Sequence, residues 1–250
     1  MRSYRACRED TTVNNANLIR DLIQNRNQES RKLNMHQQQI SKMECEKNSS
    51  KGVSTSGGWC QKASYENSGQ HKTDLSLAKQ LSIFLQDKVV SSFGDGPGRY
   101  KQILDSTGLL NGYDAYDGAP FCDTTSKGIV KYLDLTLPQY GIPVYDWIIS
   151  LEVAEHIPKK FEDTYVDNIV RHAAEGIILS WAVPGQGGYS HVNNRPLKYV
   201  EELLFTHGFY RDIQNSSLLQ SSSTLPWLKR NINVYRRLQL KNKPDLYAFA

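Results

Sequence analysis

From residue 73 onward, short apolar segments alternate with amphipathic helical segments, and this alternation constrains the fold more than any other feature of the sequence. Parallel strands need crossover connections, so the pattern predicts a largely parallel sheet with helices on both faces. We predict five such strands, at residues 89–93, 109–117, 128–134, 145–152 and 176–183. Helices are predicted at 73–88, between the first strand and Gly108, and from Pro158 through Ala173.

The end of the chain departs from this alternation. Residues 195–208 predict a helix closed by Gly208, followed by a strand near 209–213. Residues 233–240 alternate in the way that is typical of an edge strand. An antiparallel pair would complete the sheet. The predicted fold is therefore an α/β, doubly wound, mostly parallel seven-stranded sheet with an antiparallel last strand.

Residues 1–70 have a different composition, rich in Asn, Gln, Lys and Ser and poor in large apolar side chains. One amphipathic patch, formed by Leu18, Ile19, Leu22 and Ile23, indicates a helix. We predict a polar N-terminal extension at 1–70, either mobile or helical, and a single domain at 71–250. A helix that binds a partner is the alternative for the extension.

Composition limits the partners and the compartment. Thirty basic and 26 acidic residues give a net charge of +4, which is no strong nucleic-acid signature. No membrane span and no secretory signal are predicted, because the necessary apolar runs are missing. A cytoplasmic location is slightly favoured, and the compartment and oligomeric state stay open. The four cysteines lack Cys-x-x-Cys spacing, so neither a zinc ribbon nor a dithiol redox centre is predicted.

The segment VVSSFGDGPGRY carries glycine at positions 94, 96 and 98, directly after the first predicted strand. A phosphate-binding P-loop would require Gly-Lys-Ser/Thr, which the sequence lacks. A dinucleotide fingerprint, GxGxxG, would need glycine where Arg99 stands. A purely structural turn is the remaining alternative. Ligands of open parallel sheets bind at the carboxyl ends of the strands, which adds Asp114, Asp134 and Glu152 to the candidate site.

The GxGxG loop, Asp114 sixteen residues beyond Gly98, and the segment DWIISLEVAEHIP resemble the class I S-adenosylmethionine-dependent methyltransferases. EVAEHIP is similar to the EVLEH phrase of the ubiquinone-methyltransferase-like branch. From residue 74 onward the chain resembles uncharacterised animal methyltransferase-like proteins. The resemblance implies a Rossmann-like methyltransferase fold and S-adenosyl-L-methionine as the cofactor.

The resemblance also implies roles for particular residues. The three glycines would pack under the methionine part of the cofactor, and Asp114 would accept the two ribose hydroxyls. Asp134 would lie near the adenine amino group. The family usually has an acidic residue where this chain has Ser92, so the cofactor's amino group would lose a charged partner. The predicted cofactor-binding residues are Ser92, Gly94, Asp95, Gly96, Gly98, Asp114, Tyr116, Asp134, Leu151 and Glu152.

Methyl transfer to a hydroxyl or carboxyl group benefits from a base near the acceptor. His191, in the loop WAVPGQGGYSHVNNRP, is our candidate general base, and a surface histidine in a mobile loop is the alternative. In the same loop Asn193, Asn194 and Arg195 are expected to reach toward the acceptor. Glu152 and His156 are further catalytic candidates; His156 begins a helix and can instead serve as a capping or packing group.

No resident metal is predicted. As an alternative, Glu152, Glu155 and His156, together with His191, resemble the Glu-x-x-Glu-His plus His metal site of small-RNA 2′-O-methyltransferases. That resemblance would imply Mg²⁺ or Mn²⁺ and an RNA ribose as acceptor. The predicted function is that of a S-adenosylmethionine-dependent methyltransferase acting on a hydroxyl of a small molecule or glycan. A catalytically inactive binding module with the same fold is the second alternative.

Overall fold

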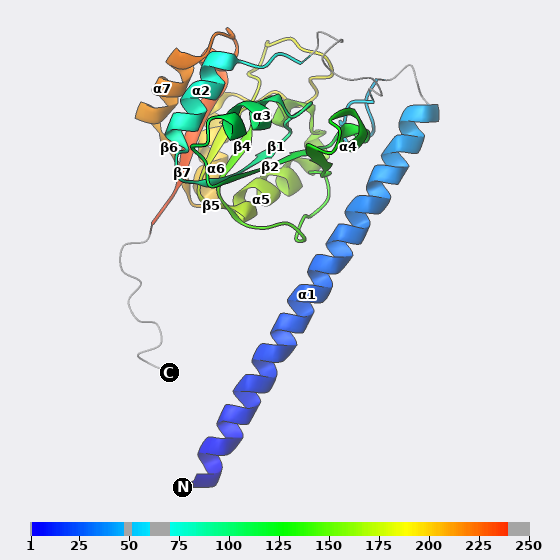
Figure 1. Cartoon of the computed structure of the whole chain (residues 1–250), viewed down its shortest axis with the longest axis vertical. Helices are drawn as coiled ribbons and strands as arrows, with labels where there is room; N and C mark the ends of the chain where they lie inside the picture. Colours follow the sequence, from blue (N-terminus) through cyan, green and yellow to red (C-terminus); the bar gives the residue numbers. More distant parts are fainter. Residues whose placement is uncertain (1, 48–51, 61–70, 240–250) are drawn as a thin grey trace.

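The computed structural model describes residues 2–47, 52–60 and 71–239. One sheet lies at the centre of the domain, with helices on both of its faces, and a long N-terminal helix lies beside it (Figure 1). The strands are β1 Val89–Phe93, β2 Gly112–Asp117, β3 Val130–Tyr132, β4 Tyr145–Ser150, β5 Ala173–Ser180, β6 Phe209–Asp212 and β7 Ile232–Arg237.

The strand order is β3-β2-β1-β4-β5-β7-β6 in a seven-stranded sheet. The β1–β2, β1–β4, β2–β3 and β4–β5 pairs are parallel, and β7 is antiparallel to both of its neighbours. The predicted doubly wound sheet with an antiparallel last strand is therefore confirmed. The prediction that the last strand lies at an edge was wrong, because β7 is inserted between β5 and β6.

Helices cover the two faces of the sheet because adjacent strand residues point in opposite directions. Ile149 and Ile178 belong to the core under α2 and α7, whereas Ile148 and Ile177 belong to the core under α5 and α6. The helices are α2 Leu75–Phe84, α3 Arg99–Ser106, α4 Cys122–Thr125, α5 Glu162–His172, α6 Leu197–Thr206, α7 Ile213–Ser222 and α8 Leu228–Asn231. Two 3₁₀ turns lie at Ala154–His156 and Lys159–Phe161.

Several helix and strand boundaries differ from those predicted from the sequence. Ala173, expected on a helix, is the first residue of β5, because α5 ends at His172 and the chain turns to extended geometry there. Helix α7 was not predicted, since its Ser- and Gln-rich sequence has little apolar periodicity. Its start is fixed instead by Asp212, whose side chain accepts a hydrogen bond from the backbone N–H of Asn215.

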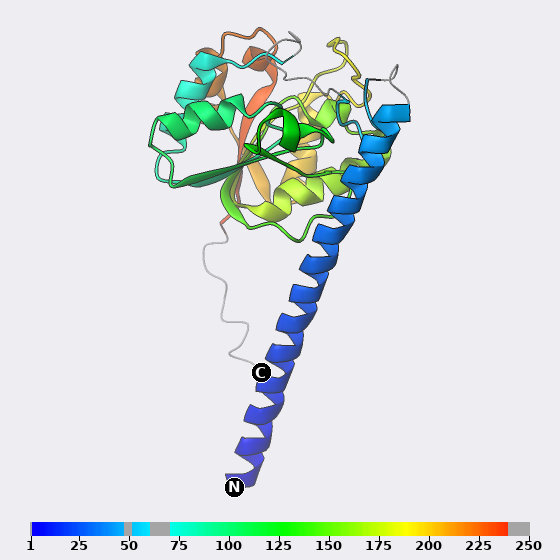
Figure 2. The same ribbon diagram turned by 45° about the vertical axis from the view of Figure 1, so that its right-hand side comes forward.

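The N-terminal helix α1, Arg2–Lys47, extends well beyond the domain at its N-terminal end (Figures 1 and 2). Its C-terminal half packs on the β3 edge through polar side chains. Asn34 donates to the backbone oxygen of Tyr132 at 2.9 Å, and Gln38 donates to that of Pro120 at 2.9 Å. A disulfide between Cys45 and Cys60 ties the end of α1 to the segment 52–60.

Helix α1 packs on the domain through its polar side chains, and its large apolar side chains face away from the domain, the opposite of the usual amphipathic arrangement. Leu33 and Ile40 are exposed, whereas Ser30 and Ser41 are buried. The apolar patch of Leu18, Ile19, Leu22 and Ile23 is exposed as well. In the part of the chain that the structure describes, every helix is too short or too polar to cross a bilayer.

Candidate functional site

The glycine loop joins β1 to α3. Gly94, Gly96 and Gly98 have φ angles of 98°, 62° and 81°, which side-chain-bearing residues rarely adopt. A Cβ on Gly94 would lie 2.1 Å from Cγ2 of Val153, so the β4–α5 connection packs directly on the loop backbone. The sequence after β1 therefore folds into a turn that favours glycine, with Gly94 half-buried and Gly96 and Gly98 buried at the carboxyl edge of the sheet.

A cavity of about 910 Å³ opens at this edge. This volume lies toward the upper end of the range of small-molecule sites, roughly 300–1,000 Å³. The walls come from the carboxyl ends of β1 to β4 and from segments outside the sheet. Those segments are 56–59, 71–73 and 183–191, and a fourth segment, 225–230, contributes Leu225, Trp227, Leu228 and Arg230. Of the predicted cofactor residues, the cavity is lined by Ser92, Gly94, Asp95, Gly96, Asp134, Leu151 and Glu152.

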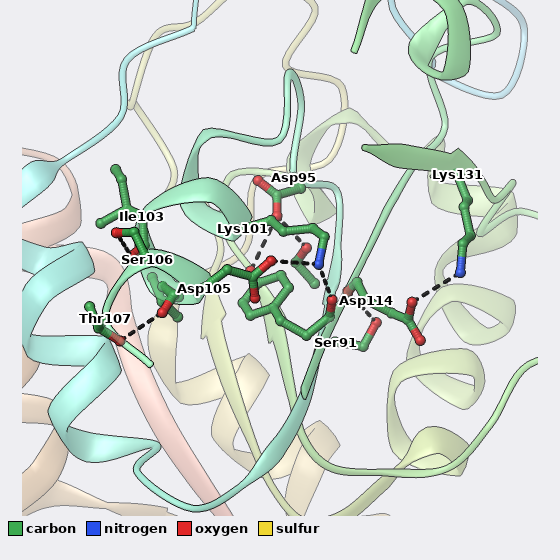
Figure 3. A network of polar contacts seen from close by, with 12 residues as sticks. Ser91, Asp95, Lys101, Ile103, Asp105, Ser106, Thr107, Asp114 and Lys131 are labelled. Atoms are coloured by element: carbon green, nitrogen blue, oxygen red, sulfur yellow. Dashed lines mark hydrogen bonds and ion pairs between the residues drawn. The ribbon is translucent and has the colours of Figure 1, made fainter. Parts of the chain in front are cut away.

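Asp114 and Tyr116 are not brought to this cavity. Asp114 lies in the middle of β2, and its carboxylate accepts hydrogen bonds from Lys131 and Tyr145, each at 3.0 Å (Figure 3). Partial burial acts to raise the pKa of Asp114, but these two partners bring it below its usual value. Tyr116 is buried against Phe93 in the core under α5 and α6. Neither residue is placed to contact a ligand at the carboxyl edge.

Asp117 occupies the position that we expected for Asp114. It is the last residue of β2 and lines the cavity. One carboxylate oxygen accepts the backbone N–H of Gly96 at 2.8 Å, and the other accepts that of Ala119 at 2.7 Å. Burial raises the pKa of Asp117 to about 6, although these two hydrogen bonds lower it. The carboxylate is thus fixed against the glycine loop.

Asp134 and Ser92 also line the cavity. The Asp134 side chain accepts hydrogen bonds from the backbone and hydroxyl of Thr136, at 2.8 and 2.6 Å. Burial raises the pKa of Asp134 against the effect of those bonds. Ser92 donates its hydroxyl proton to Oδ2 of Asp95 at 2.6 Å. Gly98 is not a wall residue; a Cβ there would meet Ile129 at 2.8 Å.

Two glutamates lie at the end of β4. Glu152 has a φ angle of 56°, and its Oε1 accepts hydrogen bonds from Ser180 and Asn231 at 2.7 and 3.1 Å. Glu155 is fully buried, and neither carboxylate oxygen has a hydrogen-bond partner among the described residues. Burial and then the charge of Glu152 raise the pKa of Glu155 well above its usual value. Burial likewise raises the pKa of Glu152.

Three histidines gather beside these carboxylates. The rings of His156 and His191 lie 5.1 Å apart, and Nδ1 of His156 lies 3.2 Å from the backbone oxygen of Ser190. Burial, and then the charge of His191, lower the pKa of His156 to about 4. Burial also lowers the pKa of His71 to about 4, with His156 as the second cause. The ligand atoms of Glu155, His156 and His191 lie within 4.8 Å of one another, as a metal site would require.

Side-chain hydrogen bonds fix the loop that carries His191. Glu162, in the first turn of α5, accepts hydrogen bonds from Asn193 at 2.8 Å and Arg195 at 2.7 Å. Asn194 donates to the backbone oxygens of Val183 and Gln186. Asn193, Asn194 and Arg195 therefore brace the loop, and the prediction that they reach toward the acceptor was wrong. His191 itself lines the cavity.

Sequence reasoning missed the contribution of the N-terminal extension. Trp59 lines the cavity and contacts the rings of His71, His156 and Tyr189, with centroids 4.6, 5.9 and 5.7 Å away. A Cβ on Gly58 would lie 2.1 Å from the backbone oxygen of Gly118, so this segment packs tightly across the end of β2. Cys45 and Cys60, which form the disulfide, were the one feature of the sequence that could have indicated the position of this segment.

No protein-family model matches the chain, and no curated protein is significantly similar to it. Among solved structures, it is similar to magnesium protoporphyrin IX methyltransferase (ChlM) from Synechocystis PCC 6803 with bound SAH. The identity is 14% over 65% of this chain and 83% of that chain, with a TM-score of 0.48.

Two further solved structures are similar over comparable spans. The methyltransferase domain of bacterial-CtHen1-C is 12% identical over 66% of this chain and 97% of that chain, with a TM-score of 0.47. The 1,6-didemethyltoxoflavin-N1-methyltransferase from Burkholderia thailandensis, with bound 1,6-didemethyltoxoflavin and S-adenosylhomocysteine, is 16% identical over 70% and 84%, with a TM-score of 0.47. The strand order itself defines the class as a Rossmann-like α/β domain with an antiparallel seventh strand.

Proposed function

We propose that the chain is a S-adenosylmethionine-dependent methyltransferase. The observation that carries the proposal is one cavity that combines the glycine loop, Asp117 and Asp134 at the ends of β1, β2 and β3. A nucleoside with an amino-acid tail needs this set, because the tail requires close backbone approach and the ribose requires a carboxylate for its two hydroxyls. We call this wall the cofactor side.

On the cofactor side, the backbone of the glycine loop at Gly94 and Gly96 takes the methionine part of the cofactor. Asp117 takes the ribose role that the sequence alone assigned to Asp114. Asp134 lies at the next strand end, where the adenine would extend, and Leu151 lines the cavity at the end of β4. When bound, the cofactor supplies a methyl group attached to a positively charged sulfur.

The aromatic and imidazole side chains of the lining, which we call the acceptor side, are Trp59, His71, His156, Tyr189 and His191. His71 packs against Gly96, where the two sides meet. A hydroxyl oxygen held here attacks the methyl carbon in line with the carbon–sulfur bond, and the bonding pair returns to sulfur. The hydroxyl proton passes to His191, so that a neutral ether remains. Alignment accounts for most of the rate of such a reaction, and the base adds a further factor. Aromatic rings around the acceptor fit a small molecule or a glycan better than an extended polyanion.

A second candidate function is methyl transfer assisted by a bound divalent cation. It is favoured by the buried Glu155 carboxylate, whose oxygens lack partners among the described residues, and by the two imidazoles beside it. Mg²⁺ or Mn²⁺ held there would fix and polarise the acceptor oxygen. An active preparation that loses its rate in EDTA and regains it with Mn²⁺ would support this form, whereas an unchanged rate would eliminate it.

Calorimetry with S-adenosylhomocysteine tests the proposed function. We expect micromolar binding by the wild type, a loss of at least about tenfold in Asp117→Ala, and near-normal binding in Asp114→Ala. Asp114 is the matched control because it is an acidic residue of the same strand that lies outside the cavity. Absence of binding by folded wild type would refute the proposal. Binding without methyl transfer to any acceptor would instead favour the inactive binding module.

A further inference from the structure

The carboxylate of Asp95 is buried beside the glycine loop with an incomplete set of partners. Ser92 and Tyr113 donate their hydroxyl protons to the same oxygen, Oδ2, at 2.6 and 3.2 Å. The other oxygen, Oδ1, has no hydrogen-bond partner among the described residues. Only 7% of the residue is exposed. A buried carboxylate oxygen of this kind is costly unless a donor or a cation meets it.

The nearby lysine does not supply that cation. The ammonium group of Lys101 donates instead to Asp105 and to the backbone oxygen of Tyr113 (Figure 3). Burial raises the pKa of Asp95 to about 7, although the hydroxyls of Ser92 and Tyr113 lower it, and the charge of Asp117 raises it further. The described part of the chain therefore places no cation on the Asp95 carboxyl group and leaves its Oδ1 without a donor.

Asp95 stands between Gly94 and Gly96 and forms part of the cavity wall together with Ser92. Ser92 holds the Asp95 carboxylate by a hydrogen bond that spans three residues, so the acid lies against the position that Ser92 occupies in the chain. Position 92 carries a serine instead of an acidic residue, and the side chain of Asp95 brings a carboxyl group next to that position. Tyr113, fully buried under the loop, fixes its orientation from the neighbouring strand.

We propose that Asp95 binds the ammonium group of the cofactor's amino-acid tail, with Ser92 and Tyr113 as the residues that position it. This inference rests on the proposed function and names the charged contact within it. Oδ1 of Asp95 matches the ammonium group of the cofactor better than its sulfonium. The ammonium group carries both a positive charge and N–H donors, whereas the sulfonium has no hydrogen-bond donor. The chain thus selects ligands that carry a free amino group next to the nucleoside.

The test compares two ligands that share the nucleoside and differ in the tail. S-adenosylhomocysteine has the ammonium group, and 5′-methylthioadenosine lacks the whole amino-acid part. We expect Asp95→Asn to weaken S-adenosylhomocysteine binding by about ten- to hundredfold, as removal of a charged hydrogen bond does. Binding of 5′-methylthioadenosine should change less than about twofold, since it makes no contact that depends on the charge. Asp105→Asn is the matched control, because Asp105 is exposed and pairs with Lys101.

A charge-relocation variant, Ser92→Asp combined with Asp95→Ser, covers the case in which Asp95→Asn is unstable. It should restore the preference for S-adenosylhomocysteine. If Asp95→Asn weakens both ligands equally, or neither, and the relocation does not restore the preference, the assignment of Asp95 is overturned while the proposed function stands. If folded wild type binds neither ligand, both proposals fall.

Discussion

The two walls of the cavity are built in different ways. The cofactor side is carried by the carboxyl ends of adjacent strands, and backbone hydrogen bonds join its parts: the N–H of Gly94 donates to the oxygen of Tyr116 at 2.8 Å. The acceptor side combines the 3₁₀ turn of His156 with segments without regular structure. Ring contacts join these parts, the backbone N–H groups of Val192 and Asn193 donate to the backbone oxygen of Glu155, and a disulfide ties the segment of Trp59 to α1. The sheet therefore fixes cofactor geometry, whereas acceptor geometry depends on contacts that individual substitutions can remove. The following experiments test this division.

The largest effect is expected on the acceptor side at His191. His191→Ala should lower kcat by roughly 10²–10³, the range for loss of a general base, and should leave the Kd for S-adenosylhomocysteine within about twofold. Single-turnover kinetics and calorimetry would measure the two values. His207→Ala is the control, since His207 lies at the end of α6 outside the cavity. A parallel loss of cofactor binding would contradict the separation of the two sides.

The disulfide should affect the acceptor side and the stability of the chain. Cys45→Ser opens a link between residues 15 positions apart, and chain entropy predicts a loss of ~3 kcal/mol in the free energy of unfolding. Thermal unfolding measures that loss. The KM for the acceptor should rise because Trp59 loses its anchor, while cofactor binding changes little. Treating the wild type with a reductant should reproduce both changes and should not affect the variant further.

Gly94→Ala should act on the cofactor side alone. A residue with φ of 98° is strained unless it is glycine, and the new Cβ would press on Val153 at 2.1 Å. We expect cofactor affinity to fall by about tenfold or more, since strain of this kind costs about 1–3 kcal/mol. Gly108→Ala is the matched control: its φ is 64°, but nothing lies within 4 Å of its Cβ. Equal losses of cofactor affinity in the two variants would assign the effect to stability rather than to the site.

The smallest effect is a dependence of stability on pH. Asp95 and Asp117 have pKa values of about 7 and about 6 in the fold, against 3.8 in the unfolded chain. Between these values the folded state binds more protons, so their contribution is present below pH 3.8 and is lost as pH rises through 6 to 7. Asp95→Asn should flatten that decline, with a difference of a few degrees in Tm between pH 5 and 8. An unchanged slope would show that Asp95 is ionised throughout.

Regular structure made the cofactor side largely predictable. The alternation of strands and helices gave the order of the elements, and the glycines at 94, 96 and 98 marked the loop. The choice between Asp114 and Asp117 was not accessible, because "YDAYDG" offers two acids on one strand and only the end of β2 decides between them. Their three-residue separation places them on opposite faces of the sheet, so the register determines which one meets the ligand.

The acceptor side was mostly hidden from sequence reasoning. His191 was found because a polar loop after β5 lies at the correct edge of the sheet. Trp59 lies in the N-terminal extension, beside Cys60, and its segment is tied by the disulfide to α1, which docks on the β3 edge. That docking uses hydrogen bonds from the side chains of Asn34 and Gln38. Polar docking residues of this kind produce no apolar periodicity in the sequence. Long-range polar contacts of this kind have no local signature.

Because of the Cys45–Cys60 disulfide, the complete cavity also requires a compartment in which this bond can form. Protein disulfides persist in oxidising compartments and are rare where glutathione and thioredoxin keep thiols reduced. In a reducing environment the chain would carry two free thiols there, with a finished nucleoside pocket and an unanchored Trp59. Loss of two electrons and two protons to an oxidant would then close the wall. Substrate selection would be a property acquired after folding, at the moment of oxidation.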